Sequence, residues 1–267
     1  MPQEARWAIV TGASAGIGAE FARQLAAKGW SLVLVARRAD RLEALARELE
    51  SAHGVATRCV ALDLASPDAA TRLVAATGGL AVEMLVNNAG YGVPGALTSQ
   101  PWPVHRDFLQ VLVSLPCELA HAYVPAMQRA KRGAIINVAS LAGHMPGSAG
   151  HTMYAASKAY LIKFSQSLAL ENERHGVQVQ ALCPGFTYSE FHDVTGARKL
   201  VSKMPSYMWM GADEVVRQSL AAIERGGPVV LVTGRINRFF KWLGKHMPDG
   251  FGLALMRRQS RKFRNAE

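Results

Sequence analysis

Trp7-Ala-Ile-Val-Thr-Gly-Ala-Ser-Ala-Gly-Ile-Gly18 is the stretch of the chain that decides its fold. The apolar run Trp7–Thr11 is typical of a buried strand, and a helical pattern follows over Ile17–Lys28. Glycines without side chains let backbone N–H groups approach a phosphate at the positive end of a helix. A strand, a glycine-rich turn and a helix in this order predict nucleotide binding. The glycines, spaced G-x-x-x-G-x-G, are Gly12, Gly16 and Gly18.

Short apolar runs alternate with helical patterns as far as about Thr233, which is typical of a parallel sheet with crossover helices. The expected strands are Trp7–Thr11, Leu32–Ala36, Thr57–Leu62, Met84–Asn87, Ala134–Val138, Gln178–Cys183 and Val229–Thr233. The expected helices lie near Ile17–Lys28, Asp40–Ser51, Asp68–Ala76, Val104–Arg129, Tyr154–His175 and Asp213–Arg225. We therefore predict an α/β fold, a Rossmann-type doubly wound seven-stranded parallel sheet. It forms a single domain over residues 1–233 with a basic C-terminal helical extension over residues 234–267.

Composition agrees with one ordinary domain. The chain has 267 residues, of which 49% are apolar and 19% charged, enough for a sizeable core. No uninterrupted apolar run reaches about 18 residues, and the first residues lead straight into a strand rather than a cleavable segment, so we expect a cytoplasmic protein. Cys59, Cys117 and Cys183 are odd in number and widely spaced, which fits neither a disulfide framework nor a zinc site. We expect all three to be small core residues and expect no metal site.

The net charge of +10 is unevenly distributed. Residues 234–267 hold nine Lys or Arg against Asp249 and Glu267, so this segment alone contributes +7. Large apolar groups are interleaved with the charges in Phe239–Leu243 and Phe251–Met256. Four interpretations stay open: a membrane surface, an acyl substrate, a partner subunit, or a helix that packs on its own domain. Nucleic acid is not expected, since no recognised binding motif accompanies the charge.

The end of the second expected strand indicates which dinucleotide the glycine-rich turn would bind. Leu34–Arg38 has no acidic residue where one would bind the ribose 2′-hydroxyl, and Arg37 and Arg38 stand there instead. Guanidinium groups match a 2′-phosphate, so the sequence favours NADP(H). The alternative is that both arginines only solvate the entry to a helix. Asp63, after the third strand, is expected to accept from the adenine amino group, or else to cap the next turn.

Three further residues point to acid–base chemistry. Tyr154 and Lys158 are four residues apart and share one face of a helix, and Ser140 lies fourteen residues upstream. A neighbouring positive charge favours phenolate, and the pKa of tyrosine must fall by roughly 2–3 units to be half ionised near neutrality. Taken singly, these residues could be a core tyrosine, a surface lysine and a helix cap. Together they indicate proton transfer at a carbonyl or an alcohol.

From Trp7 to about Thr233 the chain resembles the short-chain dehydrogenase/reductase family. Thr11–Gly18 looks like the T-G-x-x-x-G-x-G loop of that family, and Asn87–Gly90 like its N-N-A-G element. Tyr154 and Lys158 look like its Y-x-x-x-K pair. The four elements occur in the order and spacing of the family, which makes the resemblance specific.

The resemblance implies roles for individual residues. Tyr154 would be the general acid/base, Lys158 its activator and the anchor of the nicotinamide ribose, and Ser140 the hydroxyl that orients the substrate oxygen. Asn88 would lie against the cofactor, or be only a turn residue, and Thr187 would reach the nicotinamide amide, unless a β-turn alone explains the preceding Pro-Gly. The implied cofactor contacts are Gly12, Ser14, Gly16, Ile17, Gly18, Arg37, Arg38, Asp63, Leu64, Asn88, Tyr154, Lys158 and Thr187.

The resemblance also implies a homodimer or homotetramer, built from paired long helices such as Val104–Arg129 and Tyr154–His175. One position departs from the family pattern. Leu112 stands where the family often has an asparagine that holds a water in the proton relay to Lys158. Because leucine cannot hold a water, the relay could be slower, could use Ser114, or could belong to a protein with relaxed turnover.

Residues 186–211 form a long connection that we expect to contain no strand and to act as a lid over the site. Its apolar side chains predict a pocket for an apolar ketone, aldehyde or secondary alcohol, although they could equally serve only to bury the loop. We assign no catalytic role to the two histidines nearby. The residues expected around this pocket are Tyr188, Phe191, Met204, Tyr207, Met208, Trp209, His144, Met145 and His151.

The sequence thus predicts an oxidoreductase that transfers a hydride between NADP(H) and a carbonyl or secondary alcohol. The alternative is an NADPH-binding regulatory or membrane-associated protein with reduced or no turnover, which Leu112 and the basic residues 234–267 favour. An epimerase or dehydratase is a weaker hypothesis, because nothing in the sequence indicates a nucleotide-sugar site.

Overall fold

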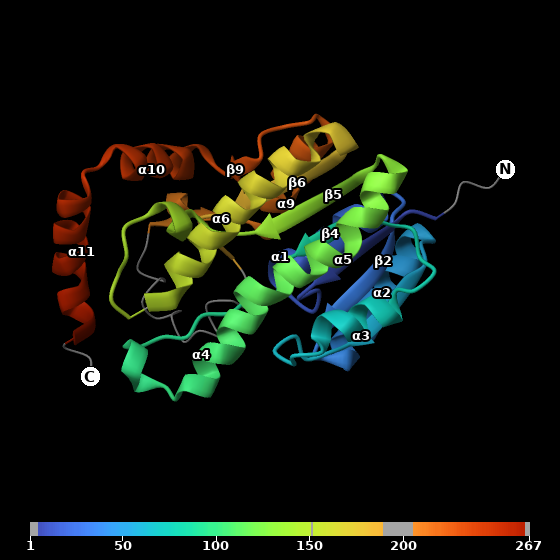
Figure 1. Ribbon diagram of the computed structural model, residues 1–267, viewed down its shortest axis with the longest axis horizontal. Helices are drawn as coiled ribbons and strands as arrows, with labels where there is room; N and C mark the ends of the chain where they lie inside the picture. Colours follow the sequence, from blue (N-terminus) through green and yellow to red (C-terminus); the bar gives the residue numbers. More distant parts are fainter. Residues whose placement is uncertain (1–4, 151, 189–204, 265–267) are drawn as a thin grey trace.

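The computed structural model describes residues 5–150, 152–188 and 205–264 (Figure 1). Its main sheet has seven strands in the order β3-β2-β1-β4-β5-β6-β9, and all neighbouring strands pair in parallel. The order reverses between β1 and β4, as in doubly wound folds. The predicted fold class and all seven predicted strands are therefore confirmed. The strands are β1 (Trp7–Thr11), β2 (Ser31–Ala36), β3 (Thr57–Ala61), β4 (Val82–Asn87), β5 (Gly133–Val138), β6 (Val177–Cys183) and β9 (Val230–Val232).

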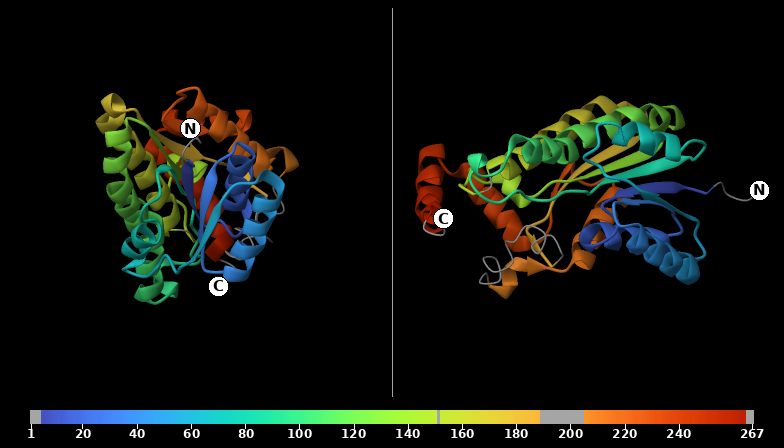
Figure 2. Two further views of the ribbon diagram at one scale, coloured as in Figure 1. Left: turned by 90° about the vertical axis from the view of Figure 1, so that its right-hand side faces the viewer. Right: turned by 90° about the horizontal axis from the view of Figure 1, so that it is seen from below.

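Helices cover both faces of this sheet (Figures 1 and 2). On one face lie α1 (Gly16–Ala27), α2 (Ala39–His53) and α9 (Ala212–Glu224). On the other lie α3 (Ala69–Ala76), α4 (Trp102–Leu109), α5 (Leu115–Ala130) and α6 (Thr152–Asn172). The short 3₁₀ turns are η1 (Leu97–Ser99), η3 (Leu141–His144), η4 (Glu173–His175) and η5 (Ser206–Met208).

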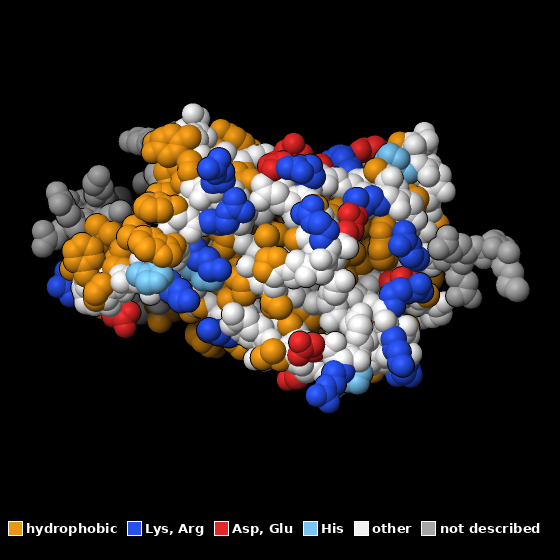
Figure 3. All heavy atoms as spheres, turned by 90° about the horizontal axis from the view of Figure 1, so that it is seen from above, with side chains coloured by type: hydrophobic (Ala, Val, Ile, Leu, Met, Phe, Trp, Pro, Cys, Tyr) orange, Lys and Arg blue, Asp and Glu red, His pale blue; other side chains and the backbone are white. Residues whose placement is uncertain are grey.

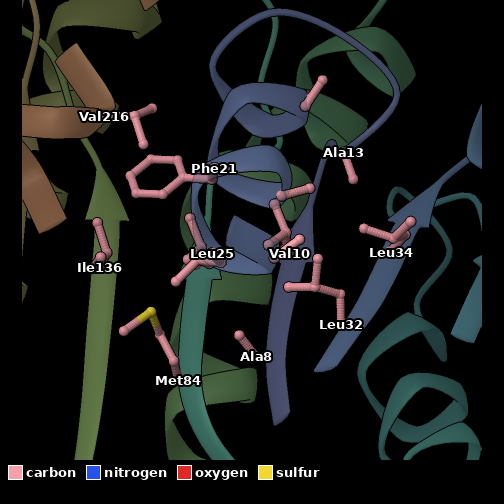
Figure 4. Close-up of a cluster of buried hydrophobic side chains, with 14 of the residues drawn as sticks. Ala8, Val10, Ala13, Phe21, Leu25, Leu32, Leu34, Met84, Ile136 and Val216 are labelled. Carbon is pink, nitrogen blue, oxygen red and sulfur yellow. The ribbon is translucent and has the colours of Figure 1, made fainter. Parts of the chain in front are cut away.

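The central strands are buried on both faces because side chains alternate along a strand. Ala8 and Val10 of β1 join the core on the side of α1, whereas Ile9 between them joins the core under α5. Phe21 of α1 lies against the first of these cores together with Val216 of α9 (Figure 4). A near-continuous apolar run is what such a strand requires, and Trp7–Thr11 supplies it.

The long helix predicted over Val104–Arg129 is interrupted. A π-helical turn, η2 (Gln110–Ser114), separates α4 from α5, and the N–H of Leu115 donates to the carbonyl of Gln110 five residues earlier. Pro116 has no N–H to donate to the carbonyl of Leu112, so the regular α-helical bond is lost at this point. Hydrophobic periodicity alone does not reveal such a turn.

The expectation that residues 186–211 contain no strand is wrong. β7 (Phe186–Thr187) and β8 (Trp209–Met210) pair in parallel as a separate two-stranded sheet. Trp209 stacks on Tyr188 with ring centroids 4.8 Å apart, which adds side-chain contacts to a very short ladder. Two-residue strands are too short to show an alternating pattern. Phe191, Met204 and His151, which we expected near the pocket, lie outside the described residues.

The expectation that all three cysteines are core residues is also wrong for one of them. Cys183 on β6 is buried and Cys117 on α5 is half-buried, but Cys59 is exposed. Cys59 lies on β3, the strand at the edge of the sheet, where every residue is half-buried or exposed. Among the described residues, no group of three or more His, Cys, Asp or Glu side chains is placed to hold a metal ion.

Two helices, α10 (Arg235–His246) and α11 (Asp249–Arg264), follow β9. They lie at the end of the molecule opposite the N-terminus, toward which the carboxyl ends of the strands point (Figures 1 and 2). None of the described helices combines the length and the apolar character needed to cross a membrane. The division of the chain at residue 233 stays a prediction.

Candidate active site

The glycine-rich turn after β1, which we call the cradle, packs so closely that side chains at Gly12 and Gly18 would collide with neighbouring atoms. Gly12 has φ +68°, and a Cβ atom built on it would lie 2.8 Å from Nδ2 of Asn88. A Cβ atom on Gly18 would collide with the carbonyl oxygen of Gly12. Nδ2 of Asn88 also donates to the carbonyl of Thr11 at 2.9 Å, which fastens this turn to the end of β4. Gly12 and Gly18 are therefore required for the close packing of this turn, while Gly12 and Gly16 also line a cavity, where backbone N–H groups at the start of a helix suit a phosphate group.

A cavity of about 870 Å³ runs from this cradle along the carboxyl ends of the strands. It brings together every residue predicted to be catalytic or to bind the cofactor except Gly18, which packs beneath the turn instead. Its polar and cofactor-side lining contains Gly12, Ser14, Gly16, Ile17, Arg37, Arg38, Asp63, Leu64, Asn88, Ser140, Tyr154, Lys158 and Thr187.

The two arginines after β2 are exposed to solvent at one end of the cavity. Arg38 donates from a terminal guanidinium nitrogen to Oγ of Ser14 at 2.9 Å, so it lies over the glycine-rich turn. Asp63 lines the same cavity, and its Oδ1 accepts from the N–H of Ala65 at 3.1 Å. Asp63 thus caps a turn, as the alternative interpretation held, while it also faces the predicted adenine region.

Lys158 is anchored inside the site. It is 5% exposed, and its Nζ donates to the carbonyl of Val138 at 2.7 Å. Burial lowers the pKa of Lys158 to about 8, because desolvation penalises the charged form. Its Nζ lies 5.7 Å from the ring centroid of Tyr154, one turn away on α6. The interpretation of Lys158 as a surface lysine is wrong.

The burial of Tyr154 among the groups of the protein favours its neutral, protonated form. Desolvation raises the pKa of Tyr154 to about 12, although a hydrogen bond with Ser140 acts in the lowering direction. The fall in the pKa of Tyr154 that we expected from the neighbouring lysine is not found, because burial penalises the charged phenolate. A protonated phenol beside a hydroxyl suits proton donation to an oxygen atom. Ser140 also accepts from the N–H of Ala142 at 3.1 Å, so it caps η3 as well as facing the cavity.

A buried chain of amides holds α6 against the sheet. Nδ2 of Asn87 on β4 donates to Oδ1 of Asn137 on β5 at 2.8 Å. Nδ2 of Asn137 donates to Oγ of Ser165 on α6 at 2.9 Å, and that hydroxyl donates to the carbonyl of Leu161 at 2.7 Å. Because α6 carries Tyr154, these hydrogen bonds hold the phenol in position relative to the sheet.

Leu112 is the residue at which we expected the asparagine of the family pattern. It is 1% exposed and packs in the core under α5. Its Cγ and Nζ of Lys158 are equally close, at 3.7 Å, to a Cβ atom built on Gly90, so both groups border the same small space. An apolar group therefore stands beside the lysine where a polar side chain would bind a water.

Away from the cofactor cradle, the cavity is walled mainly by apolar groups. Met145 and Met208 line it as predicted, whereas Tyr188 and Tyr207 are 60% and 67% exposed and do not. Trp209 also stays outside the lining, because it packs in the β7–β8 sheet. His144 is half-buried beside the cavity but does not line it.

Sequence reasoning missed several residues that line this region. Phe240 of α10 and Met256 of α11 contribute to the wall, and so do Tyr91 and Phe186. The apolar residues inside the basic C-terminal segment carried the signal for Phe240 and Met256, because one interpretation of that segment was contact with an acyl substrate. Nothing in the sequence distinguished their inward direction from that of neighbouring apolar residues.

Comparison with known proteins agrees with this site. A family model described as short chain dehydrogenase matches residues 6–199. The chain is 34% identical over 206 residues to a very-long-chain 3-oxoacyl-CoA reductase of Laccaria bicolor, covering 76% of this chain and 61% of the relative. It is 34% identical over 181 residues to the 7beta-hydroxysteroid dehydrogenase of Collinsella aerofaciens, covering 68% of each. The chain thus spans about three fifths of the length of the 3-oxoacyl-CoA reductase.

Solved structures give the same answer. A 7beta-hydroxysteroid dehydrogenase studied for its stereoselectivity superposes with a TM-score of 0.83 at 28% identity, covering 94% of this chain and 96% of that one. A short-chain dehydrogenase from Sphingobium yanoikuyae in complex with NADPH has a TM-score of 0.80 at 30% identity, covering 91% and 96%. The protein belongs to the short-chain dehydrogenase/reductase family, whose members are oxidoreductases that use a nicotinamide cofactor.

Proposed function

We propose that the protein is an NADP(H)-dependent oxidoreductase that interconverts a bulky apolar ketone and its secondary alcohol. The observation that carries the proposal is the meeting of Ser140, Tyr154 and Lys158 in one cavity with the glycine-rich cradle and Arg38. A proton donor, its charged neighbour and a phosphate site lie where one substrate and one dinucleotide can meet.

The residues divide the chemistry among them. When bound, the nicotinamide cofactor supplies or accepts the hydride. Ser140 orients the substrate oxygen with its hydroxyl, and Tyr154 donates its phenolic proton to that oxygen as the ketone is reduced. Lys158 holds a positive charge behind the phenol and stabilises the phenolate left by this transfer. Oxidation of the alcohol reverses each step, with the phenolate of Tyr154 as the base.

The preference for NADP(H) rests on charge at the end of β2. Arg37 and Arg38 present guanidinium groups to the cavity, and the residues of β2 and its end include no carboxylate that would repel a 2′-phosphate. The NADPH complex of the Sphingobium relative supports this assignment by analogy.

The preference for a bulky apolar substrate rests on the far wall of the cavity. Met145, Met208, Phe240 and Met256 supply flexible or aromatic apolar surface there, which suits a large hydrophobic skeleton. The names of two relatives point the same way, since one acts on very-long-chain 3-oxoacyl-CoA and the other on a 7beta-hydroxysteroid.

Replacement of Tyr154 by Phe tests the proposal. Oxidation of NADPH at about 340 nm, followed across bulky and small ketones, should fall at least about a thousandfold in Tyr154→Phe, because the proton donor is lost. Affinity for NADPH should change little, because the adenine and phosphate contacts remain. Unchanged turnover in this variant would remove Tyr154 from the mechanism.

A second function has a specific observation in its favour. Leu112 puts an apolar group beside Lys158, so a protein that binds NADPH but reacts slowly is the alternative. Tight NADPH binding by the wild-type protein, with no turnover of any ketone or alcohol in the panel, would favour this regulatory role over catalysis.

A further inference from the structure

The outward face of α10 carries a strip of large apolar side chains. Phe239 is 57% exposed, Trp242 is 56% exposed and Leu243 is 38% exposed. The rings of Phe239 and Trp242 stack on each other with centroids 6.1 Å apart. Seen from above, hydrophobic side chains gather at the end of the molecule where α10 lies, with Lys and Arg side chains beside them (Figure 3).

The opposite face of α10 is already packed, so this strip cannot simply rotate inward. Asn237 is 5% exposed, and its Nδ2 donates to the carbonyl of Thr233 at 2.8 Å. Phe240 lines the cavity, and a Cβ atom on Gly244 would lie 2.7 Å from the methyl group of Met145. The exposed strip is therefore a fixed property of the fold rather than an unpacked core face.

Basic residues border the strip. Arg235, Arg238 and Lys245 are exposed on α10, and the sequence of this helix contains no acidic residue. The adjoining helix α11 adds exposed Phe251 and Arg257, with Phe251 at 65% exposure. Helices that lie in the interface of an anionic bilayer typically carry aromatic groups flanked by Lys and Arg.

We propose that α10 and the first part of α11 dock on the surface of an anionic lipid bilayer. Charge complementarity favours this occupant over a second copy of the chain. The chain has a net charge of +10, of which +7 lies in residues 234–267, so two identical surfaces of this kind would repel each other. Anionic phosphatidylserine headgroups would instead attract this basic surface. The apolar strip then enters the headgroup region while the basic side chains contact phosphates.

The two helices of the docking surface also form part of the cavity wall. Phe240 and Met256, from the same two helices, line the cavity wall while their neighbours Phe239 and Arg257 face outward. Docking would therefore place the apolar end of the cavity next to the lipid, where an apolar substrate is concentrated. This last step rests on the proposed function, whereas the docking itself does not.

Co-sedimentation of the full chain with vesicles tests the proposal. Phosphatidylcholine vesicles with phosphatidylserine should pellet the protein, and phosphatidylcholine vesicles alone should not. Binding should weaken at high salt, because the charged contacts are screened. Arg238→Glu/Lys245→Glu should weaken partitioning at least about tenfold. A matched charge control, Arg72→Glu/Arg129→Glu, alters exposed residues of α3 and α5 and should retain most of it.

A second variant and its matched control test the contribution of apolar side chains to vesicle binding. Phe239→Ser/Trp242→Ser should weaken binding to the anionic vesicles at least about tenfold, because two aromatic anchors are removed. Trp102→Ser, at a 61% exposed tryptophan on α4, should leave it unchanged. Intrinsic fluorescence of the wild-type chain should shift to the blue on vesicle binding, a readout that needs no variant.

Three results would overturn the proposal. In the first, the wild type does not bind anionic vesicles. In the second, all four variants bind them equally. In the third, the wild type does not bind vesicles but associates with itself, and this self-association disappears in Phe239→Ser/Trp242→Ser. The last would identify a second copy as the occupant. NADPH turnover of a water-soluble ketone, measured on the same variants, separates the two hypotheses, since vesicle binding without turnover leaves the docking intact and rejects only the proposed reaction.

Discussion

At the scale of single residues, the proposed preference for NADP(H) rests on Arg37 and Arg38, and Arg38 provides the sharpest test of it. Its guanidinium lies over the glycine-rich turn through Ser14. Arg38→Ala should weaken NADPH binding by about tenfold to a hundredfold, which corresponds to the loss of one or two charge-assisted hydrogen bonds. NADH, which has no 2′-phosphate, should bind with unchanged affinity. Quenching or enhancement of cofactor fluorescence measures both dissociation constants.

Arg47→Ala is the control, since Arg47 is an exposed arginine further along α2 that does not line the cavity. It should leave both affinities unchanged. An equal loss of NADPH and NADH affinity in Arg38→Ala would show that the arginine supports the turn itself rather than a 2′-phosphate.

His144 gives the molecule a defined sensitivity to acid. Burial, with Lys241 and Lys163 nearby, lowers its pKa from 6.5 to about 4. The unfolded chain therefore binds a proton at a higher pH than the folded chain, and stability is lost as the pH falls from 6.5 toward 4. Because the imidazole is only half-buried, the loss should be about 1–2 kcal/mol rather than the full value of the shift.

Urea denaturation of the wild type and of His144→Gln, at about pH 7 and about pH 4.5, measures this loss as a difference between the two proteins. The wild type should lose about 1–2 kcal/mol more than the variant over this interval. Parallel losses in both proteins would assign the acid sensitivity to other groups.

At the scale of elements, the chain of buried amides connects the sheet to α6, the helix that carries the proposed catalytic residues Tyr154 and Lys158. Asn137→Ala should lower the free energy of unfolding by about 2–4 kcal/mol, because Asn87 and Ser165 each lose a buried partner. It should also lower kcat, since α6 is then free to shift against β5. Urea denaturation and steady-state kinetics measure the two effects.

Asn172→Ala separates the two effects. Asn172 is 1% exposed at the far end of α6, where its Oδ1 accepts from Gln128 and its Nδ2 donates to Leu168. Its loss should cost similar stability, because a buried amide is removed in both cases, but should leave kcat nearly unchanged. An equal effect of both variants on kcat would mean that the amide chain acts through stability alone.

Elements with strong periodicity and motifs with fixed spacing were predictable from the sequence. The seven parallel strands follow from short apolar runs between helical patterns, and the cofactor side of the cavity follows from the glycine spacing and the Tyr154–Lys158 pair. The π-helical turn depends on a missing N–H at Pro116, and the β7–β8 pair is two residues long, so neither leaves a periodic pattern. The oligomeric state and the cytoplasmic location stay predictions.

At the scale of the whole molecule, the proposed catalytic residues come from the turn after β5 and from α6, whereas part of the proposed substrate wall comes from the last two helices. Gly252 of α11 packs on Pro146, and Met256 of the same helix lines the cavity. Removal of residues 248–267 should therefore raise KM for a bulky apolar ketone about tenfold, which corresponds to the apolar burial of roughly one methionine side chain. Steady-state kinetics with a bulky and a small ketone measure the change.

The same deletion should leave the NADPH dissociation constant and the KM for a small ketone unchanged, because the cradle at Gly12 and the proposed catalytic residues lie on other elements. A chain that lacks only residues 266–267 serves as the control for shortening. If the deletion lowers kcat for both ketones alike, α11 supports the whole site rather than one wall of it. A selective rise in KM, reproduced by Met256→Ala, would locate substrate selection in a helix that contributes no catalytic group.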